Sequence, residues 1–131
     1  MAKKPLISVV CPCYNEELML PLYYEAMRER VFAQLTEYDV ELIFINDGSK
    51  DRTLPILREL AKADERVKYI SFSRNFGKEA AMYAGLKHAS GDFVCVMDCD
   101  LQDPPEMIEQ MLKRLIDEDH DCVATRRVTR K

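Results

Sequence analysis

Leu6–Pro12 reads LISVVCP, a run of apolar residues broken only by one serine. Such a run is typical of a strand buried on both faces, as strands in a parallel sheet are. Further stretches of this kind follow along the chain: Val40–Asn46 (VELIFIN), Val67–Ser73 (VKYISFS), Phe93–Met97 (FVCVM) and Asp121–Thr125 (DCVAT). Stretches with apolar residues at helical spacing separate them. This alternation predicts an α/β fold with a Rossmann-like, doubly wound and mostly parallel sheet of five strands.

Four helices are expected in the intervening stretches, around residues 19–27, 54–61, 80–88 and 107–115. The third is rich in alanine, which indicates close packing on the sheet. The fourth has the clearest predicted start. Asp103 can cap it, Pro104 and Pro105 suit its first turn, and Glu106 completes a D-x-x-E pattern that resembles a capping box.

Composition restricts the class of protein. The 131 residues amount to one domain, and 47% hydrophobic with 32% charged residues is ordinary for a soluble protein. The net charge of -4 argues against nucleic-acid binding, which needs a basic face. No apolar run reaches the ~18 residues of a membrane span. The five cysteines lack a zinc-site spacing and fall mostly in predicted buried segments, so we expect inert thiols in the cytoplasm.

Polar residues directly follow each predicted strand, where ligands bind in sheets of this type. The groups are Pro12–Glu17, Asp47–Asp51, Ser73–Lys78, Asp98–Asp103 and Thr125–Arg127. Each group also has a purely structural interpretation as a helix cap, a turn or a solvated charge.

Asp98 and Asp100 are the hardest of these residues to explain structurally. Two carboxylates two positions apart at a strand end can point to the same side and share one cation. Without a cation they would repel each other, whereas a divalent metal would bridge them to phosphate oxygens. Gln102 continues the spacing with a neutral oxygen. The pattern predicts a site for Mg²⁺ or Mn²⁺.

Four ordered motifs together resemble the family 2 inverting glycosyltransferases with the GT-A fold. They are PCYNEE (residues 12–17), DGSKDRT (47–53), SRNFGKEAA (73–81) and DCDLQDPPE (98–106). The similarity is greatest to the polyprenyl-phosphate sugar transferases, that is, bactoprenol glucosyltransferases and dolichol-phosphate mannose synthases. It covers nearly the whole chain. It implies transfer of a sugar, with inversion, from a nucleoside-diphosphate sugar, expected to be a UDP-sugar, to a polyprenyl phosphate.

The resemblance also assigns substrate-binding residues. It implies that Tyr14 lies near the base of the nucleotide and that Asp47 accepts a hydrogen bond from a pyrimidine. Lys78 stands where the family has a contact to the nucleotide. The residues expected around the nucleotide are Pro12, Tyr14, Asn15, Glu16, Asp47, Lys78 and Asp98.

Metal and phosphate contacts follow from the same resemblance. Asp98, Asp100 and Gln102 match a metal-binding D-x-D-x-Q, with Asp100 the expected catalytic residue. Arg127 and Arg130 match arginines that face phosphate on the acceptor or donor side. Thr125 replaces a glycine that is usual in the family, so the resemblance does not predict the backbone conformation of that segment.

The family's catalytic region extends well past the fifth strand. We therefore expect residues 1–131 to be the nucleotide-sugar-binding part of a longer, membrane-anchored protein whose active site faces the cytoplasm. Membrane contact would come only through parts absent from this chain, and no nucleic-acid partner is expected.

Other α/β enzymes fit less well. A haloacid-dehalogenase-like phosphotransferase has its D-x-D after the first strand, and a receiver-like domain has its lysine after the last. A dinucleotide dehydrogenase needs G-x-G-x-x-G where this chain has Pro12-Cys13-Tyr14. A nucleotide-sugar-binding module without turnover, lacking the acceptor half, remains the main alternative.

Overall fold

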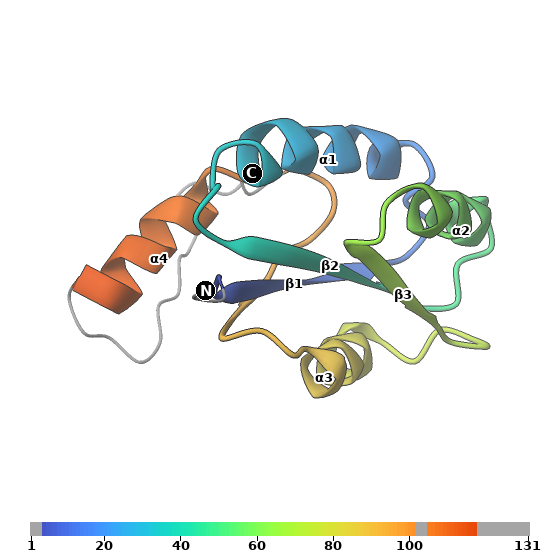
Figure 1. The fold of residues 1–131 in the computed structure, drawn as a ribbon. Coiled ribbons are helices and arrows are strands. Elements are labelled where there is room, and N and C mark those ends of the chain that lie inside the picture. Colours follow the sequence, from blue (N-terminus) through green and yellow to red (C-terminus); the bar gives the residue numbers. More distant parts are fainter. Residues whose placement is uncertain (1–3, 102–104, 118–131) are drawn as a thin grey trace, which may run out of the picture.

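The computed structural model describes residues 4–101 and 105–117 (Figure 1). The elements in chain order are β1 (Leu6–Cys13), α1 (Met19–Met27), the π-helical turn η1 (Arg28–Phe32), β2 (Asp39–Asn46), α2 (Thr53–Ala63), β3 (Val67–Ser71), α3 (Lys78–His88), β4 (Phe93–Val96) and α4 (Met107–Asp117). The predicted alternation of strands and helices is confirmed over this part of the chain. The predicted fifth strand lies outside the described residues, as do Asp103, Gln102, Arg127 and Arg130.

All four strands are parallel, in the order β3-β2-β1-β4. The chain builds outward from β1 through β2 to β3 and then returns to add β4 on the other side of β1. The strand order therefore reverses between β1 and β4. In open α/β sheets, ligands bind beyond the carboxyl ends of the strands at this reversal.

Helices cover both faces of the sheet, with α1 and α2 on one face and α3 on the other (Figure 1). The central strand β1 is buried on both faces: Val9 packs in the core that includes α1 and α4, and Val10 packs in the core under α3. This double burial is why β1 is almost continuously apolar. The outer strands β3 and β4 are shorter and more exposed, and β3 (VKYIS) mixes polar with apolar residues.

The alanine-rich helix α3 packs closely on the sheet, as predicted. Ala81 is fully buried, and a Cβ added at Gly85 would lie 2.3 Å from Cγ1 of Val10 and 2.7 Å from Cδ1 of Ile45. His88, at the end of the same helix, is exposed, and its Nδ1 lies 2.9 Å from the carbonyl oxygen of Ala84. Close packing thus depends on the smallest residues of the helix.

The start of α4 differs from the prediction. The helix begins at Met107, so Pro105 and Glu106 precede it instead of forming its first turn. The backbone nitrogen of Ile108 bonds to the carbonyl oxygen of Pro105, an i to i+3 turn that enters the helix. The Glu106 carboxylate lies 3.5 Å from Arg30. The predicted capping box needs Asp103, which lies outside the described residues, so it stays a prediction, and the Glu106 side chain contacts Arg30 of η1.

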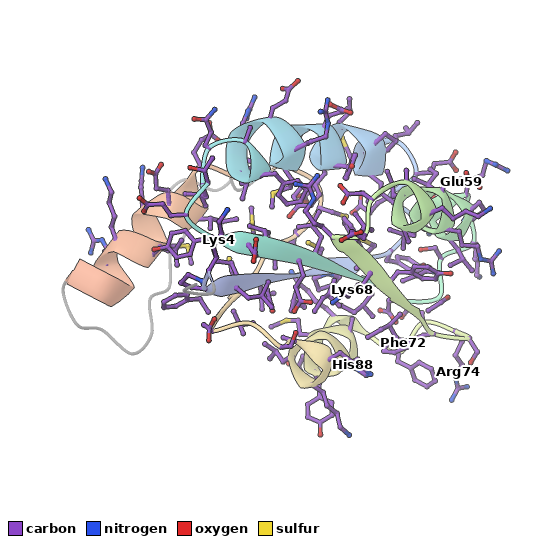
Figure 2. All side chains as sticks on the ribbon, viewed as in Figure 1. Lys4, Glu59, Lys68, Phe72, Arg74 and His88 are labelled. Carbon is purple, nitrogen blue, oxygen red and sulfur yellow. The ribbon has the colours of Figure 1, made fainter. Side chains whose placement is uncertain are left out.

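A buried carboxylate links the strands at the opposite end of the sheet from the predicted site. Glu41 on β2 is 3% exposed and accepts hydrogen bonds from Ser8 (2.5 Å), Lys68 (2.7 Å) and the backbone of Ser90 (3.1 Å). Figure 2 shows Lys68 on β3. Burial acts to raise the pKa of Glu41, but the bonds from Lys68, Ser8 and Ser90 outweigh it and hold the pKa at about 2. Glu41 on β2 thus connects β1, β3 and the loop that precedes β4 through hydrogen bonds.

Within residues 4–101 and 105–117, none of the helices combines the length and apolar character that crossing a bilayer requires.

Candidate functional site

A pocket of about 240 Å³ opens where the strand order reverses. It is lined by Pro12, Cys13, Tyr14, Glu16, Asp47, Lys78, Asp98 and Asp100. All of these except Cys13 are residues singled out from the sequence. They come from segments up to 88 positions apart, and they meet because the carboxyl ends of parallel strands share one edge of the sheet.

Asn15 does not line this pocket. Its backbone has a φ of 53°, a left-handed conformation that asparagine tolerates better than most residues. Its backbone nitrogen donates to Oγ of Ser49 (2.9 Å), and its Oδ1 accepts from the backbone nitrogen of Lys50 (2.8 Å). Asn15 therefore joins the loop after β1 to the loop after β2, and its predicted substrate contact stays a prediction.

The backbone of Glu16 is fixed by two residues at the start of α2. Its nitrogen donates to Oγ1 of Thr53 (2.9 Å), and the Thr53 hydroxyl donates to Oδ1 of Asp51 (2.6 Å). Burial, followed by the negative charges of Asp100, Asp98 and Asp51, raises the pKa of Glu16. The carboxylates of Glu16, Asp98 and Asp100 line the same pocket, which therefore concentrates negative charge.

Asp47 is buried to 4% exposure and has several internal hydrogen-bond donors. Its carboxylate accepts from the backbone nitrogens of Phe76 (2.7 Å) and Gly77 (3.0 Å) and from Nδ2 of Asn75 (3.1 Å). Because these bonds organise the loop that leads into α3, Asp47 has a structural role that the sequence did not predict. Its predicted bond to a pyrimidine would add to these contacts.

The loops after β2 and β3 approach each other at a glycine. Gly48 has a φ of 70°, and a Cβ there would lie 2.2 Å from the carbonyl carbon of Arg74. Figure 2 shows Arg74 and Phe72 beyond the end of β3. Only glycine fits this approach, so the residue is part of the geometry that positions Asp47.

Lys78 and Asp98 form an ion pair across the pocket. Lys78 is the first residue of α3, and its Nζ lies 2.8 Å from Oδ1 and 3.0 Å from Oδ2 of Asp98. The two side chains are 58% and 30% exposed. Both lie at the solvent boundary, where the ammonium can exchange partners readily.

Asp98 and Asp100 line the pocket together, as the strand-end pattern predicted. Among the described residues, no three His, Cys, Asp or Glu side chains are grouped so that they could hold a metal by themselves. Magnesium sites in nucleotide-dependent enzymes commonly use one or two carboxylates and complete the coordination with substrate phosphates and water. The donor set present, two hard carboxylates in an acidic pocket, fits that kind of site. Gln102 lies outside the described residues.

Cys13 is the lining residue that sequence reasoning missed. Its Sγ lies 3.2 Å from Sγ of Cys99, and both residues are buried. The contact with Cys99 and burial raise the pKa of Cys13, so the thiol stays protonated. Cys99 faces the core between Asp98 and Asp100, which directs both carboxylates to the pocket side. The alternation of acidic and apolar residues in Asp98-Cys99-Asp100 is the sequence signal that could have predicted a buried cysteine at this position.

A larger pocket of about 400 Å³ lies at the other end of the sheet, next to α4. It is lined by Gln34, Leu35, Thr36, Glu37, Tyr38, Glu109, Leu112 and Lys113. It contains none of the predicted site residues and lies away from the strand-order reversal. The smaller pocket is therefore the candidate site.

The chain is similar in sequence to curated bactoprenol glucosyl transferases. It is 52% identical over 108 residues to that of Shigella phage SfV, which covers 82% of this chain and 34% of the phage protein. It is 50% identical over 108 residues to the prophage bactoprenol glucosyl transferase homolog of Escherichia coli K12, covering 82% of this chain and 35% of that protein. The chain thus spans about a third of the length of these relatives.

Solved structures share the fold. The mannosyltransferase PcManGT from Pyrobaculum calidifontis, in complex with GDP-Man and Mn²⁺, superposes with a TM-score of 0.73 at 23% identity, covering 88% of this chain and 33% of that one. At this identity it supports the fold alone. TarS 1-349 of S. aureus in complex with UDP gives a TM-score of 0.67 at 28% identity, covering 88% and 32%. The neighbours are GT-A fold glycosyltransferases, so the expected fold is confirmed.

The family model of glycosyl transferase family 2 matches residues 8–131. Together with the curated relatives, this match shows that the chain belongs to glycosyl transferase family 2.

Proposed function

We propose that this chain is the nucleotide-sugar-binding part of an enzyme that transfers a glycosyl group, with inversion, to a polyprenyl phosphate. The proposed donor is a UDP-sugar, and Mg²⁺ or Mn²⁺ assists. The observation that carries the proposal is the pair Asp98 and Asp100 in one pocket at the reversal between β1 and β4. The similarity to bactoprenol glucosyl transferases, at 50–52% sequence identity, supports a polyprenyl phosphate as the acceptor. Solved TarS complexes with UDP and UDP-GlcNAc support the donor class.

The pocket residues suit a nucleoside diphosphate. Tyr14 is 44% exposed at the pocket, so its ring can offer a face to the base. Asp47 accepts a further hydrogen bond from the base, which selects a pyrimidine. Lys78 contacts the diphosphate, because a flexible ammonium suits phosphate oxygens. These roles define a donor site that extends from the loop after β1 to the start of α3.

Asp98, Asp100 and Gln102 are proposed to hold the divalent cation, with Asp100 as the catalytic residue. When bound, the cation stabilises the negative charge that builds up on the leaving diphosphate. The acceptor phosphate is already an anionic nucleophile, so no strong general base is needed. Arg127 and Arg130 would position it, since a guanidinium bonds two phosphate oxygens at once.

A second candidate is a nucleotide-sugar-binding module without turnover. It is favoured by the length of the chain, which is about a third of its relatives. An acceptor site completed by the remaining two thirds would leave this part able to bind the donor but not to transfer the sugar. Alignment of acceptor and anomeric carbon contributes about 7–11 kcal/mol of barrier lowering in well-oriented cases, and an open site would lose much of it.

Calorimetric titration with uridine diphosphate tests the binding half of the proposal. We expect binding in the presence of Mn²⁺ and much weaker binding after chelation. Equal affinity under both conditions would exclude the metal role of Asp98 and Asp100.

Transfer of labelled sugar to a polyprenyl phosphate tests the catalytic half and separates the two candidates. The chain alone and a longer form of the protein are compared, with donor hydrolysis measured beside transfer. We expect both to bind uridine diphosphate but only the longer form to transfer sugar efficiently. Comparable transfer rates would show that the acceptor site is complete within 131 residues.

A further inference from the structure

The charges around the candidate site are unbalanced. Four of the residues that line the pocket carry carboxylates, Glu16, Asp47, Asp98 and Asp100, whereas Lys78 is the only lysine or arginine among them. Asp47 is occupied by hydrogen bonds from the loop before α3. Among the described residues that line the pocket, Lys78 is therefore the cation that contacts a carboxylate proposed to hold a metal, that of Asp98.

Lys78 binds the oxygens that a metal would use. Its Nζ contacts both oxygens of Asp98, at 2.8 Å and 3.0 Å. An ammonium at this position and a divalent cation on the same carboxylate would repel each other. Metal binding at Asp98 therefore requires the Lys78 side chain to move away or weakens its contact.

The Lys78 side chain can move without a change in the backbone. Its backbone is held at the start of α3, where Gly77 bonds to Asp47 and Ala81 bonds back to Gly77. The side chain beyond it is 58% exposed and carries a long flexible stem. Displacement of the ammonium thus costs only an exposed ion pair.

We propose that Lys78 occupies the place of the divalent cation in the donor-free protein and transfers to the donor diphosphate when the metal binds. This inference rests on the proposed function and adds to it how metal binding and nucleotide binding are coupled. The diphosphate gives the displaced ammonium a new anionic partner, so metal and nucleotide bind cooperatively. By linkage, the metal strengthens nucleotide binding by the same factor by which the nucleotide strengthens metal binding.

Replacing Lys78→Met tests this because methionine keeps the length of the side chain and removes the charge. Mn²⁺ binding is measured without nucleotide, from the electron paramagnetic resonance signal of the free ion. We expect Lys78→Met to bind Mn²⁺ about two- to fivefold more tightly than the unmodified chain, the range that an exposed ion pair allows. Unchanged or weaker Mn²⁺ binding would overturn the proposal.

Two further variants serve as controls. Lys78→Arg keeps the positive charge, so its Mn²⁺ affinity should remain that of the unmodified chain. Lys87→Met removes an exposed lysine from the same helix, where the Nζ lies over the Tyr83 ring and not at the pocket. It should leave Mn²⁺ affinity unchanged. A tighter affinity in Lys87→Met would show that general charge, and not the contact to Asp98, controls metal binding.

The second arm repeats the Mn²⁺ titration with saturating uridine diphosphate. The nucleotide should strengthen Mn²⁺ binding in the unmodified chain and do so by a smaller factor in Lys78→Met. An equal factor in both proteins would contradict the transfer of Lys78 to the diphosphate. If uridine diphosphate does not bind the unmodified chain at all, the proposed function fails, whereas the nucleotide-free comparison still decides whether Lys78 competes with metal.

Discussion

Oδ2 of Asp47 accepts a hydrogen bond from the backbone nitrogen of Gly77 at 3.0 Å, although the two residues are 30 positions apart. The bond connects the end of β2 to the residue before α3. The carboxylate predicted to recognise the base thus also fixes the segment that carries Lys78. The contact therefore links the residue proposed to bind the base, Asp47, to the segment that carries the residue proposed to bind phosphate, Lys78.

Replacing Asp47→Ala should therefore affect both stability and binding. Loss of a charged acceptor for buried backbone donors should reduce the free energy of unfolding by about 1–3 kcal/mol, measured by urea denaturation. Binding of uridine diphosphate should weaken while its metal dependence remains, because Asp98 and Asp100 are intact. Asp39→Ala, at the opposite end of β2, is the matched control and should change neither. If uridine and guanosine diphosphates compete equally for the unmodified chain, Asp47 does not select the base.

Replacing Asp100→Asn should weaken metal-dependent binding of uridine diphosphate and leave the fold intact. The substitution keeps the shape of the side chain but removes the charge that attracts a divalent cation. The residue is half-buried at the pocket and is not part of the apolar core. Calorimetry with Mn²⁺ measures the binding, and the thermal midpoint measures the fold. Asp39→Asn is the control. Undiminished Mn²⁺-dependent binding in Asp100→Asn would remove this residue from the metal site.

The free energy of unfolding should decrease as the pH is lowered, because Glu41 becomes protonated. The pKa of this carboxyl is about 2 in the folded protein, below the ordinary value of 4.5. The depressed pKa contributes stability that is present above pH 4.5 and is lost as the pH falls toward 2. In Glu41→Gln this contribution is missing, so the difference in unfolding free energy from the unmodified chain should shrink between pH 5 and pH 2.5.

Urea denaturation at a series of pH values measures this difference. The pKa of Asp64 is also held at about 2, so Asp64 adds its own pH dependence to the unfolding free energy. This contribution is the same in the unmodified chain and in Glu41→Gln, and it cancels in the difference between them. Glu59→Gln, on the exposed side of α2, should behave like the unmodified chain at every pH. A difference between Glu41→Gln and the unmodified chain that stays constant with pH would contradict the low pKa of Glu41.

Replacing Gly85→Ala should destabilise the protein, even though alanine favours helices by about 1 kcal/mol over glycine. The added Cβ would lie 2.3 Å from Cγ1 of Val10, so overpacking of about 1–3 kcal/mol should dominate. In the background of Val10→Ala, the same substitution should cost less because the Cγ1 methyl of Val10, its nearest contact, is gone, while Cδ1 of Ile45 at 2.7 Å remains. Thermal or urea unfolding of the four proteins measures this coupling. A stabilising effect of Gly85→Ala alone would show that α3 does not pack this closely.

Much of the fold could be predicted because each strand carries its own signal. The apolar run at Leu6–Pro12 corresponds to β1, which ends one residue later at Cys13. The strand-end rule then brought Tyr14, Asp47 and Asp98 to one pocket without any knowledge of side-chain contacts. Periodicity and topology were sufficient for both results.

What the sequence missed depends on contacts between distant segments. The Cys13 and Cys99 thiols meet across 86 positions, and the Asp47 bonds to Phe76 and Gly77 span 29 and 30. The bond between the Asn15 side chain and the backbone nitrogen of Lys50, 35 positions away, was likewise not predicted. These side chains have several possible partners in sequence terms, and only the packing of the loops decides among them.

The central claim is that a nucleoside diphosphate binds at the reversal between β1 and β4. Backbone amide shifts of the ¹⁵N-labelled chain during titration with uridine diphosphate and Mg²⁺ test it most directly. We predict shift changes concentrated in residues 13–16, 47–48, 77–78 and 98–100, with residues 34–38 of the larger pocket unaffected. Changes centred on residues 34–38, or no changes at saturating nucleotide, would contradict it.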